Sequence, residues 1–223
     1  MRIVDVTPAD LNAALRDPAV RAIRVAGYRI LDDLDVAAVR RDPKPIIGTG
    51  DTTFVHLELW RRCGSVGYHG SDQPELAPIK LCASKARTSQ ASGHASGTLL
   101  GGSLAAVRAM IGAGLPDLTG AILLLTGERT QGLGQVDRQL THLRRAGIRG
   151  SVAAVAVGVF TGFDGYVDRG WTLRDVLHDH LSRLTVPVLT GLPIGPGRPA
   201  VPIGTNAHLD ATKRTLTIDA AVS

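Results

Sequence analysis

Short runs of β-branched residues alternate with amphipathic stretches along the whole 223-residue chain. The runs expected to form strands are Arg2–Val6, Ala22–Val25, Pro45–Ile47, Val66–Tyr68, Gly120–Leu125, Val152–Val157 and Val186–Leu189. The stretches with helical periodicity are Pro8–Arg16, Thr52–Cys63, Ser103–Gly112, Val136–Ala146 and Thr172–Leu184. Because strands that alternate with helices form mainly parallel sheets, this pattern predicts an α/β protein.

Two segments interrupt the alternation. Residues Ala83–Gly97 are rich in Ser, Ala, Gly and Lys, a composition typical of a linker. We therefore expect one domain over residues 1–82, a linker over 83–97 and a second domain over 98–223. The segment Gly191–Pro199 contains glycines and prolines that cannot continue a helix or a central strand, so it predicts a loop.

The composition argues against several classes of partner. The formal charge is +5 and the pI about 9.7, but the arginines are scattered and only 4% of residues are aromatic, so we expect no nucleic-acid binding.

Neither Cys63 nor Cys82 has a second ligand at metal-binding spacing. His178 and His180 are two positions apart on a predicted helix and do not face one another. We therefore expect no metal and no cofactor.

The chain also lacks the signals of export and membrane insertion. Its first residues contain no apolar stretch of signal-peptide length, and no window approaches the roughly 20 apolar residues that span a bilayer. These features predict a cytoplasmic protein without a membrane partner.

Four motifs occur in an order that points to a known family. The first is Lys44–Trp60 followed by Gly67-Tyr-His-Gly, and the second is Gly97-Thr-Leu-Leu-Gly-Gly-Ser-Leu. The third is Val136-Asp-Arg-Gln-Leu with Leu143-Arg-Arg-Ala-Gly, and the fourth extends from Gly158 to Leu209-Asp. Together they resemble the LD-carboxypeptidase family, which includes the microcin C immunity peptidases, and an ordered set is more specific than one glycine motif.

This resemblance implies a two-domain architecture. A shortened N-terminal three-layer α/β domain would carry the nucleophile elbow, and a C-terminal α/β domain would supply a glutamate and a histidine. The active site would lie between the two domains. The resemblance also implies an oxyanion hole, of which the family's first motif survives only as Val25-Ala-Gly-Tyr-Arg, while the amide of Asp51 sits on an intact elbow.

The chain departs from the family at the residues of the catalytic triad. The family's serine aligns with Gly50, its glutamate with Thr126 and its histidine with Pro196. Glycine has no oxygen that a base could activate. An engineered knockout would need only one change, because loss of one triad member already removes most catalysis. The alignment therefore predicts that this chain is not a serine carboxypeptidase.

Other polar residues near the elbow are candidates for a different chemistry. Asp51, Glu128 and His69 are the candidate catalytic groups, although a polar surface loop explains Glu128 as well and a structural role explains His69. Thr49 and Thr52 flank the elbow but lack an assigned base. The expected ligand-binding set is Gly27, Tyr28, Thr49, Gly50, Thr52, Thr126, Arg129 and Pro196.

Three functions remain open from the sequence. In the first, the cleft binds a small amino-acid or peptide-like molecule and promotes a reaction without an acyl intermediate. In the second, the protein is a pseudoenzyme that binds a ligand or pairs with an active homologue. In the third, it is a hydrolase by another route. The order given is our order of preference, and we expect a homodimer because the shortened N-terminal part would expose a sheet edge.

Overall fold

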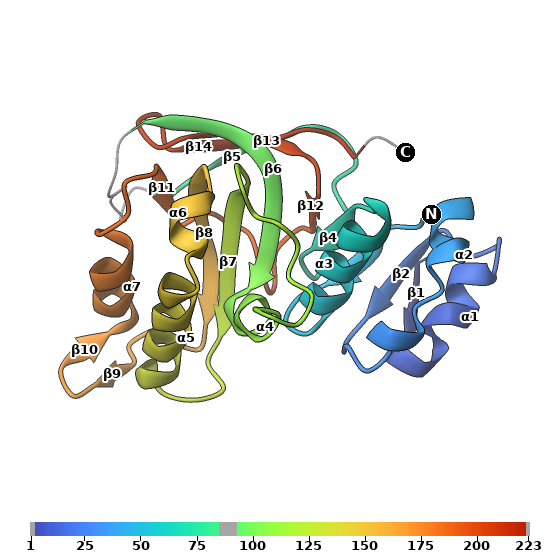
Figure 1. Ribbon diagram of the computed structural model, residues 1–223, viewed down its shortest axis with the longest axis horizontal. Helices are drawn as coiled ribbons and strands as arrows, with labels where there is room; N and C mark the ends of the chain where they lie inside the picture. The colour runs from blue at the N-terminus through green and yellow to red at the C-terminus, as the bar shows by residue number, and fades with distance from the viewer. Residues whose placement is uncertain (1–2, 85–92, 222–223) are drawn as a thin grey trace.

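The computed structural model describes residues 3–84 and 93–221, which form two sheets side by side (Figure 1). The strands of the first sheet, in spatial order, are β1 (Ile3–Val6), β2 (Ala22–Val25), β3 (Ile46–Gly48), β4 (Gly67–His69) and β12 (Val201–Ile203). The strands β1 to β4 are parallel, and β12 pairs antiparallel with β4. The predicted α/β class is confirmed.

Short helices cover the first sheet. They are η1 (Pro8–Asp10), α1 (Leu11–Arg16), η2 (Leu31–Asp33), α2 (Val36–Arg41) and α3 (Thr52–Cys63). Their inner faces pack on the strands through a core that includes Leu11, Ile23 and Val55. Helix α3 has the predicted bounds and ends at Gly64, whose φ of 68° only glycine adopts without strain. Helix α2 was missed because it is only six residues long.

The second sheet is larger. Its strands, in spatial order, are β11 (Val188–Thr190), β8 (Ala154–Thr161), β7 (Ile122–Glu128), β6 (His94–Ser103), β13 (Asn206–Asp210), β14 (Thr215–Ile218) and β5 (Ile79–Cys82). The four strands from β11 to β6 are parallel, and the remaining pairings are antiparallel. The sheet bends so far that its two edges meet, since Ser84 N donates to Gly191 O at 3.1 Å.

Helices line one face of the parallel strands in Figure 1. They are α4 (Leu104–Ala109), α5 (Leu133–Arg145), α6 (Ile148–Ser151) and α7 (Leu173–Leu181). A hairpin of β9 (Val167–Asp168) and β10 (Trp171–Thr172) precedes α7. Apolar side chains such as Leu124, Leu140 and Leu177 form the core between sheet and helices. The predicted loop over Gly191–Pro199 is confirmed, because no helix or strand occurs there.

The two halves of the chain exchange strands, which the predicted division at a linker did not anticipate. Strand β12 follows the predicted linker but completes the first sheet, and β5 precedes it but belongs to the second. Of the predicted linker over 83–97, residues 85–92 lie outside the described residues, and His94–Gly97 form the start of β6. The linker prediction is therefore wrong over His94–Gly97, where small residues pair with β13.

In residues 3–84 and 93–221, no helix has both the length and the apolar character needed to cross a bilayer.

Candidate functional site

The turn between β3 and α3 has the form of a nucleophile elbow. Gly50 has a φ of +58°, in the left-handed region, and a Cβ placed there would meet no heavy atom within 4 Å. Thr52 N and Thr53 N donate to Thr49 O and Gly50 O, which closes the turn and starts the helix. Any side chain at position 50 would therefore project into open space from a strained turn. In this chain that space is empty of side-chain atoms.

The threonines beside Gly50 differ in their surroundings. Thr52 is fully buried, and its Oγ1 donates to Val25 O at 2.6 Å, so the hydroxyl holds the elbow helix against β2. The expectation that Thr52 contacts a ligand stays a prediction, and the burial of its hydroxyl argues against it. Thr49 is half-buried at the start of the turn and stays a candidate ligand contact.

A buried pair lies behind the elbow, between the two sheets. His69 at the end of β4 has no exposed surface, and its Nε2 lies 2.9 Å from Oγ1 of Thr126 on β7, which is 1% exposed. A Cβ placed at Gly102 would lie 2.7 Å from Thr53 Oγ1 and 3.0 Å from His69 Nδ1. A Cβ at Gly195 would lie 3.4 Å from Thr126 Cγ2. The first turn of α3, the end of β7 and the Gly195 loop therefore lie close to the imidazole of His69.

The charge of His69 follows from its enclosure. Burial lowers the pKa of His69 to about 3, and repulsion from the neighbouring His56 acts in the same direction, so the ring is neutral at pH 7. Its Nδ1 is buried and has no hydrogen-bond partner among the described residues. A buried N–H without an acceptor costs more than a buried lone pair without a donor, so the proton belongs on Nε2, which donates to Thr126. The expectation that His69 is catalytic stays a prediction, and its burial and its bond to Thr126 favour the structural role.

The other two candidate catalytic groups are exposed and separate. Asp51 lies at the N-terminus of α3 and makes no side-chain capping bond. Glu128 ends β7, where its backbone pairs with Thr161. In the described parts of the chain, no hydrogen bond or ion pair joins these two carboxylates to each other or to His69. Whether they act together stays a prediction.

Arg129 and Tyr28 lie on different elements, and only Tyr28 contacts the elbow helix. Arg129 Nε donates to Gly162 O at 2.5 Å, and its guanidinium lies 4.5 Å from the centre of the Tyr166 ring. These contacts hold Arg129 against the loop after β8. Tyr28 is 41% exposed, and its ring packs on Phe54 of α3 at 4.8 Å between centroids. Gly27 has a φ of +130°, and a Cβ there would lie 2.7 Å from Pro8 Cγ, so only glycine fits.

Pro196 lies on the loop after β11 and lines a cavity. Gly197 N donates to Ser71 Oγ at 3.2 Å, which joins this loop to the end of β4. The cavity has a volume of about 940 Å³ and lies between this loop, the loop after β8 and the start of α7. Volumes of this order suit small-molecule ligands. Apolar and polar groups line it, among them Phe160, Phe163, Leu177, Thr161, Asp164 and Arg198.

Sequence reasoning found Pro196 but missed most of this cavity. The signals available were two glycine-rich loops, at 158–165 and 191–198, which lie far apart in the sequence and line the same space. No cluster of three or more His, Cys, Asp or Glu in the described residues could hold a metal ion.

Comparison with known proteins covers nearly the whole chain. Residues 7–70 match the model of the LD-carboxypeptidase N-terminal domain, and residues 96–209 match that of the LD-carboxypeptidase C-terminal domain. A Streptomyces coelicolor protein named as a carboxypeptidase is 34% identical over 95% of this chain and 76% of its own length.

Solved structures with the same fold carry related names. The crystal structure of muramoyltetrapeptide carboxypeptidase from Oxalobacter formigenes matches with a TM-score of 0.80 at 25% identity, over 97% of this chain and 83% of that one. The microcin C7 self-immunity protein in complex with aspartyl sulfamoyl adenosine matches with a TM-score of 0.78 at 19% identity, over 96% and 80% of the two chains. The latter likeness bears on the fold alone.

Proposed function

Because this chain belongs to the LD-carboxypeptidase family, we propose that it binds a small peptide-like ligand and does not cleave it through an acyl-enzyme. One observation carries the proposal. The elbow that would present the attacking oxygen has its strained geometry, but the residue at its tip is Gly50. A covalent intermediate needs a nucleophilic atom at that point, and glycine offers none.

Two hydroxyls close to the elbow are held by other partners, and the third, that of Thr49, has no assigned base. Thr52 and Thr126 are buried, and the oxygen of each is bonded to a fixed partner, Val25 O in one case and His69 in the other. The imidazoles of His56 and His69 are neutral but enclosed, so neither can reach a substrate hydroxyl or water without a conformational change. These features support ligand binding without peptidase chemistry.

The ligand class is suggested by the cavity beside Pro196 and by a structural relative. The cavity combines aromatic walls with two arginines, Arg174 and Arg198, and one carboxylate, Asp164. Groups of both charges suit a ligand with both an amino and a carboxyl group. The relative named above was solved with aspartyl sulfamoyl adenosine, an aminoacyl compound. Arg129 and Tyr28 are the remaining candidate contacts.

The second candidate function is a reaction without an acyl intermediate. It is favoured by the exposure of Asp51 and Glu128, neither of which is committed to a side-chain hydrogen bond in the described parts of the chain. Carboxylates without a fixed partner suit general acid or base catalysis. The double substitution Asp51→Asn/Glu128→Gln separates the two functions. If the two carboxylates are catalysts, the variant should lose turnover of the ligand but keep its affinity for the ligand.

The proposal is tested with an LD-linked tetrapeptide. We expect saturable binding by calorimetry and no release of the terminal D-residue over a day of incubation. Release of that residue would overturn the proposal, and so would the absence of any binding. A family member that retains the serine serves as the positive control for cleavage.

A further inference from the structure

Two histidines lie side by side on the second sheet, away from the elbow. The rings of His94 on β6 and His208 on β13 have centroids 5.9 Å apart, with an angle of 37° between the ring planes. Both side chains are exposed, and of the other histidines in the chain only His178 is exposed too. The sequence spacing that predicted no metal could not reveal this pair, because the register between two strands brings it together.

The sheet places both rings on the same face. In the ladder between the two strands, His208 lies opposite Ser96 and His94 lies opposite Asp210. Opposite residues share a face of a sheet, and so do residues two positions apart on one strand. Leu209, which alternates with them on β13, is fully buried in the core, so the histidines face outward. Two hydrogen-bonded strands therefore hold the rings side by side.

The ring nitrogens of the pair are available as metal ligands. Nδ1 of His208 lies 2.9 Å from Oγ of Ser96. When Nδ1–H donates to this hydroxyl, Nε2 carries a lone pair, and Nε2 has no hydrogen-bond partner among the described residues. Within the same ranges, neither ring nitrogen of His94 has one. Proteins orient metal-binding histidines through such a bond on the second ring nitrogen.

The carboxylate beside the pair is committed to its own turn. Asp210 Oδ1 accepts from Lys213 N at 2.8 Å, and its Oδ2 lies 3.3 Å from Lys213 Nζ. In residues 3–84 and 93–221, no group of three His, Cys, Asp or Glu is arranged to hold a metal ion. The protein therefore supplies two ligands at this place, and water must complete the coordination of any bound metal.

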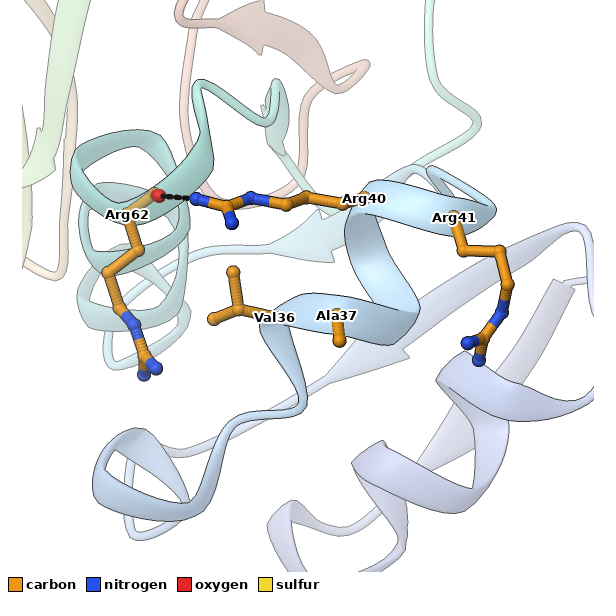
Figure 2. Close-up of a pocket in the computed structure, with 5 residues that line it drawn as sticks. All are labelled: Val36, Ala37, Arg40, Arg41 and Arg62. Carbon is orange, nitrogen blue, oxygen red and sulfur yellow. Dashed lines mark hydrogen bonds between the residues drawn. The ribbon is translucent and has the colours of Figure 1, made fainter.

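A second cluster of basic side chains lacks such a close approach. The groove between α2 and the last turn of α3 is lined by Val36, Ala37, Arg40, Arg41 and Arg62. Arg40 Nη2 donates to Arg62 O at 2.8 Å, which satisfies a carbonyl at the end of α3. The side chains of Arg41 and Arg62 extend on either side of Val36 and Ala37 (Figure 2). These guanidinium groups therefore do not meet at one point, whereas the two imidazoles do lie together.

From this geometry we propose that His94 and His208 bind one divalent transition-metal ion, of the class of Zn²⁺ and Ni²⁺, with water in the remaining positions. Imidazole nitrogen suits these ions, whereas Mg²⁺ and Ca²⁺ prefer oxygen. Two imidazoles that share a tetrahedral ion through bonds of ~2.0 Å have ring centroids roughly 5 Å apart. The spacing of 5.9 Å reaches that value through small rotations of two exposed rings.

The test is a calorimetric titration of the full chain, without an affinity tag, with NiCl₂ and separately with MgCl₂. We expect one Ni²⁺ per chain with a Kd of about 0.1 mM or tighter, and no saturable binding of Mg²⁺. His94→Gln and His208→Gln should each weaken Ni²⁺ binding at least ~10-fold, because either change leaves a single imidazole. The double variant should lose little more than either single variant.

The matched control changes the other exposed histidine. His178→Gln on α7 should keep the parent affinity for Ni²⁺. A loss in only one of the two single variants would overturn the proposal, because it would indicate binding to one imidazole. An equal loss in His178→Gln, one ion for every two chains, equal affinity for Mg²⁺ or no saturable binding of Ni²⁺ would overturn it too.

Discussion

The imidazole of His69 is enclosed on every side and joined to Thr126 at 2.9 Å. These two residues stand 57 positions apart in the sequence and belong to different sheets. Their contact fills the position at which the family resemblance places an acidic group. A neutral hydrogen bond between buried residues stabilises the join between the sheets but provides no charge for catalysis.

Substitution of Thr126 tests this role. Thr126→Val removes the acceptor and leaves both ring nitrogens of His69 without partners, so the free energy of unfolding should fall by about 1–3 kcal/mol in urea denaturation. Thr126→Ser keeps the hydroxyl, so its free energy of unfolding should fall by less. A larger loss in Thr126→Ser than in Thr126→Val would mean that packing of the methyl group, and not the hydrogen bond, matters at this site.

Acid should destabilise the protein through its buried histidines. Burial lowers the pKa of His69 to about 3 and that of His56 to about 4, while both return to about 6.5 on unfolding. The unfolded chain therefore binds more protons below pH 6.5, and stability falls as the pH drops toward the folded values. Each histidine should cost roughly 2 kcal/mol at pH 5 relative to pH 7. Urea titrations of His69→Gln should show about half of the pH dependence seen in the parent; an unchanged dependence would contradict the assignment.

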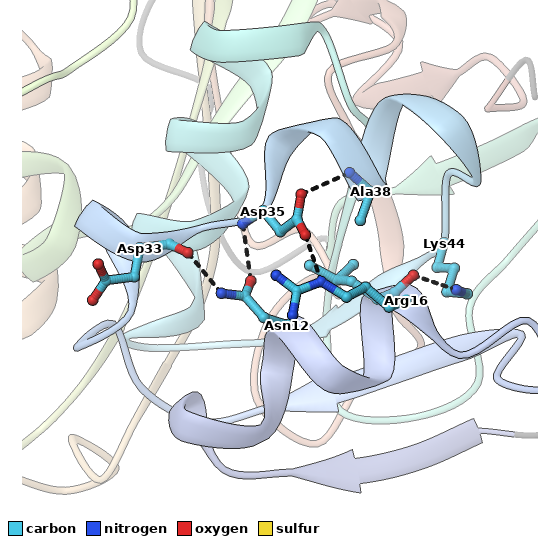
Figure 3. Close-up of polar contacts among 7 residues, drawn as sticks. Asn12, Arg16, Asp33, Asp35, Ala38 and Lys44 are labelled. Atoms are coloured by element: carbon cyan, nitrogen blue, oxygen red, sulfur yellow. Dashed lines mark hydrogen bonds and ion pairs between the residues drawn. The ribbon is translucent and has the colours of Figure 1, made fainter.

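At the scale of elements, a polar network fastens α1 to α2 (Figure 3). Asn12 Nδ2 donates to Asp33 O at 2.6 Å, and its Oδ1 accepts from Asp35 N at 2.9 Å. Arg16 reaches the carboxylate of Asp35, which also caps α2. Buried Lys44 donates to Leu15 O at 2.6 Å at the end of α1. These bonds position α2 beside α1.

Removal of Asn12 should loosen this connection. Asn12→Ala deletes the two hydrogen bonds that the Asn12 side chain makes to Asp33 O and Asp35 N. The free energy of unfolding should fall by about 1–2 kcal/mol. The other asparagine, Asn206, is exposed and makes no side-chain hydrogen bond within the described ranges, so Asn206→Ala should change stability by less than about 0.5 kcal/mol. Comparable losses in the two variants would argue against a special role for the network.

Sequence pattern located most elements because buried strands and amphipathic helices carry strong local signals. Ala22–Val25 and Thr52–Cys63 have the predicted bounds. Strand β6 was missed over its whole length, because its first residues are small and polar and resemble a linker, and its pairing with β13 depends on residues more than a hundred positions away. In the site, Gly50 could be placed by resemblance. The burial of Thr52 and His69 could not, because it depends on how the two sheets pack.

At the scale of the whole molecule, the two halves are joined by a close approach of backbone. Strand β12 pairs with β4, and Ser71 N donates to Arg198 O just beyond that pair. A Cβ added at Gly70 would lie 2.4 Å from Ala200 Cα. The sheet of the N-terminal half is therefore completed by the C-terminal half. The homodimer and the cytoplasmic location expected from the sequence stay predictions.

A methyl group at Gly70 tests this joint. Gly70→Ala should separate β4 from the segment before β12 and lower the free energy of unfolding by at least about 2 kcal/mol, with one cooperative transition. Gly150→Ala, where a Cβ meets no atom within 4 Å, should be neutral or slightly stabilising. A parent protein that unfolds in two separate transitions would contradict the account of a shared sheet.

The central claim concerns the chemistry available at the elbow, and covalent labelling tests it most directly. The full chain is incubated with an excess of a fluorophosphonate, and its intact mass is measured beside that of a family member that retains the serine. We predict labelling of the family member and an unchanged mass for this chain, because Gly50 presents no oxygen for phosphonylation. A mass increase of one phosphonyl group, mapped to Thr49 or Thr52, would contradict the account.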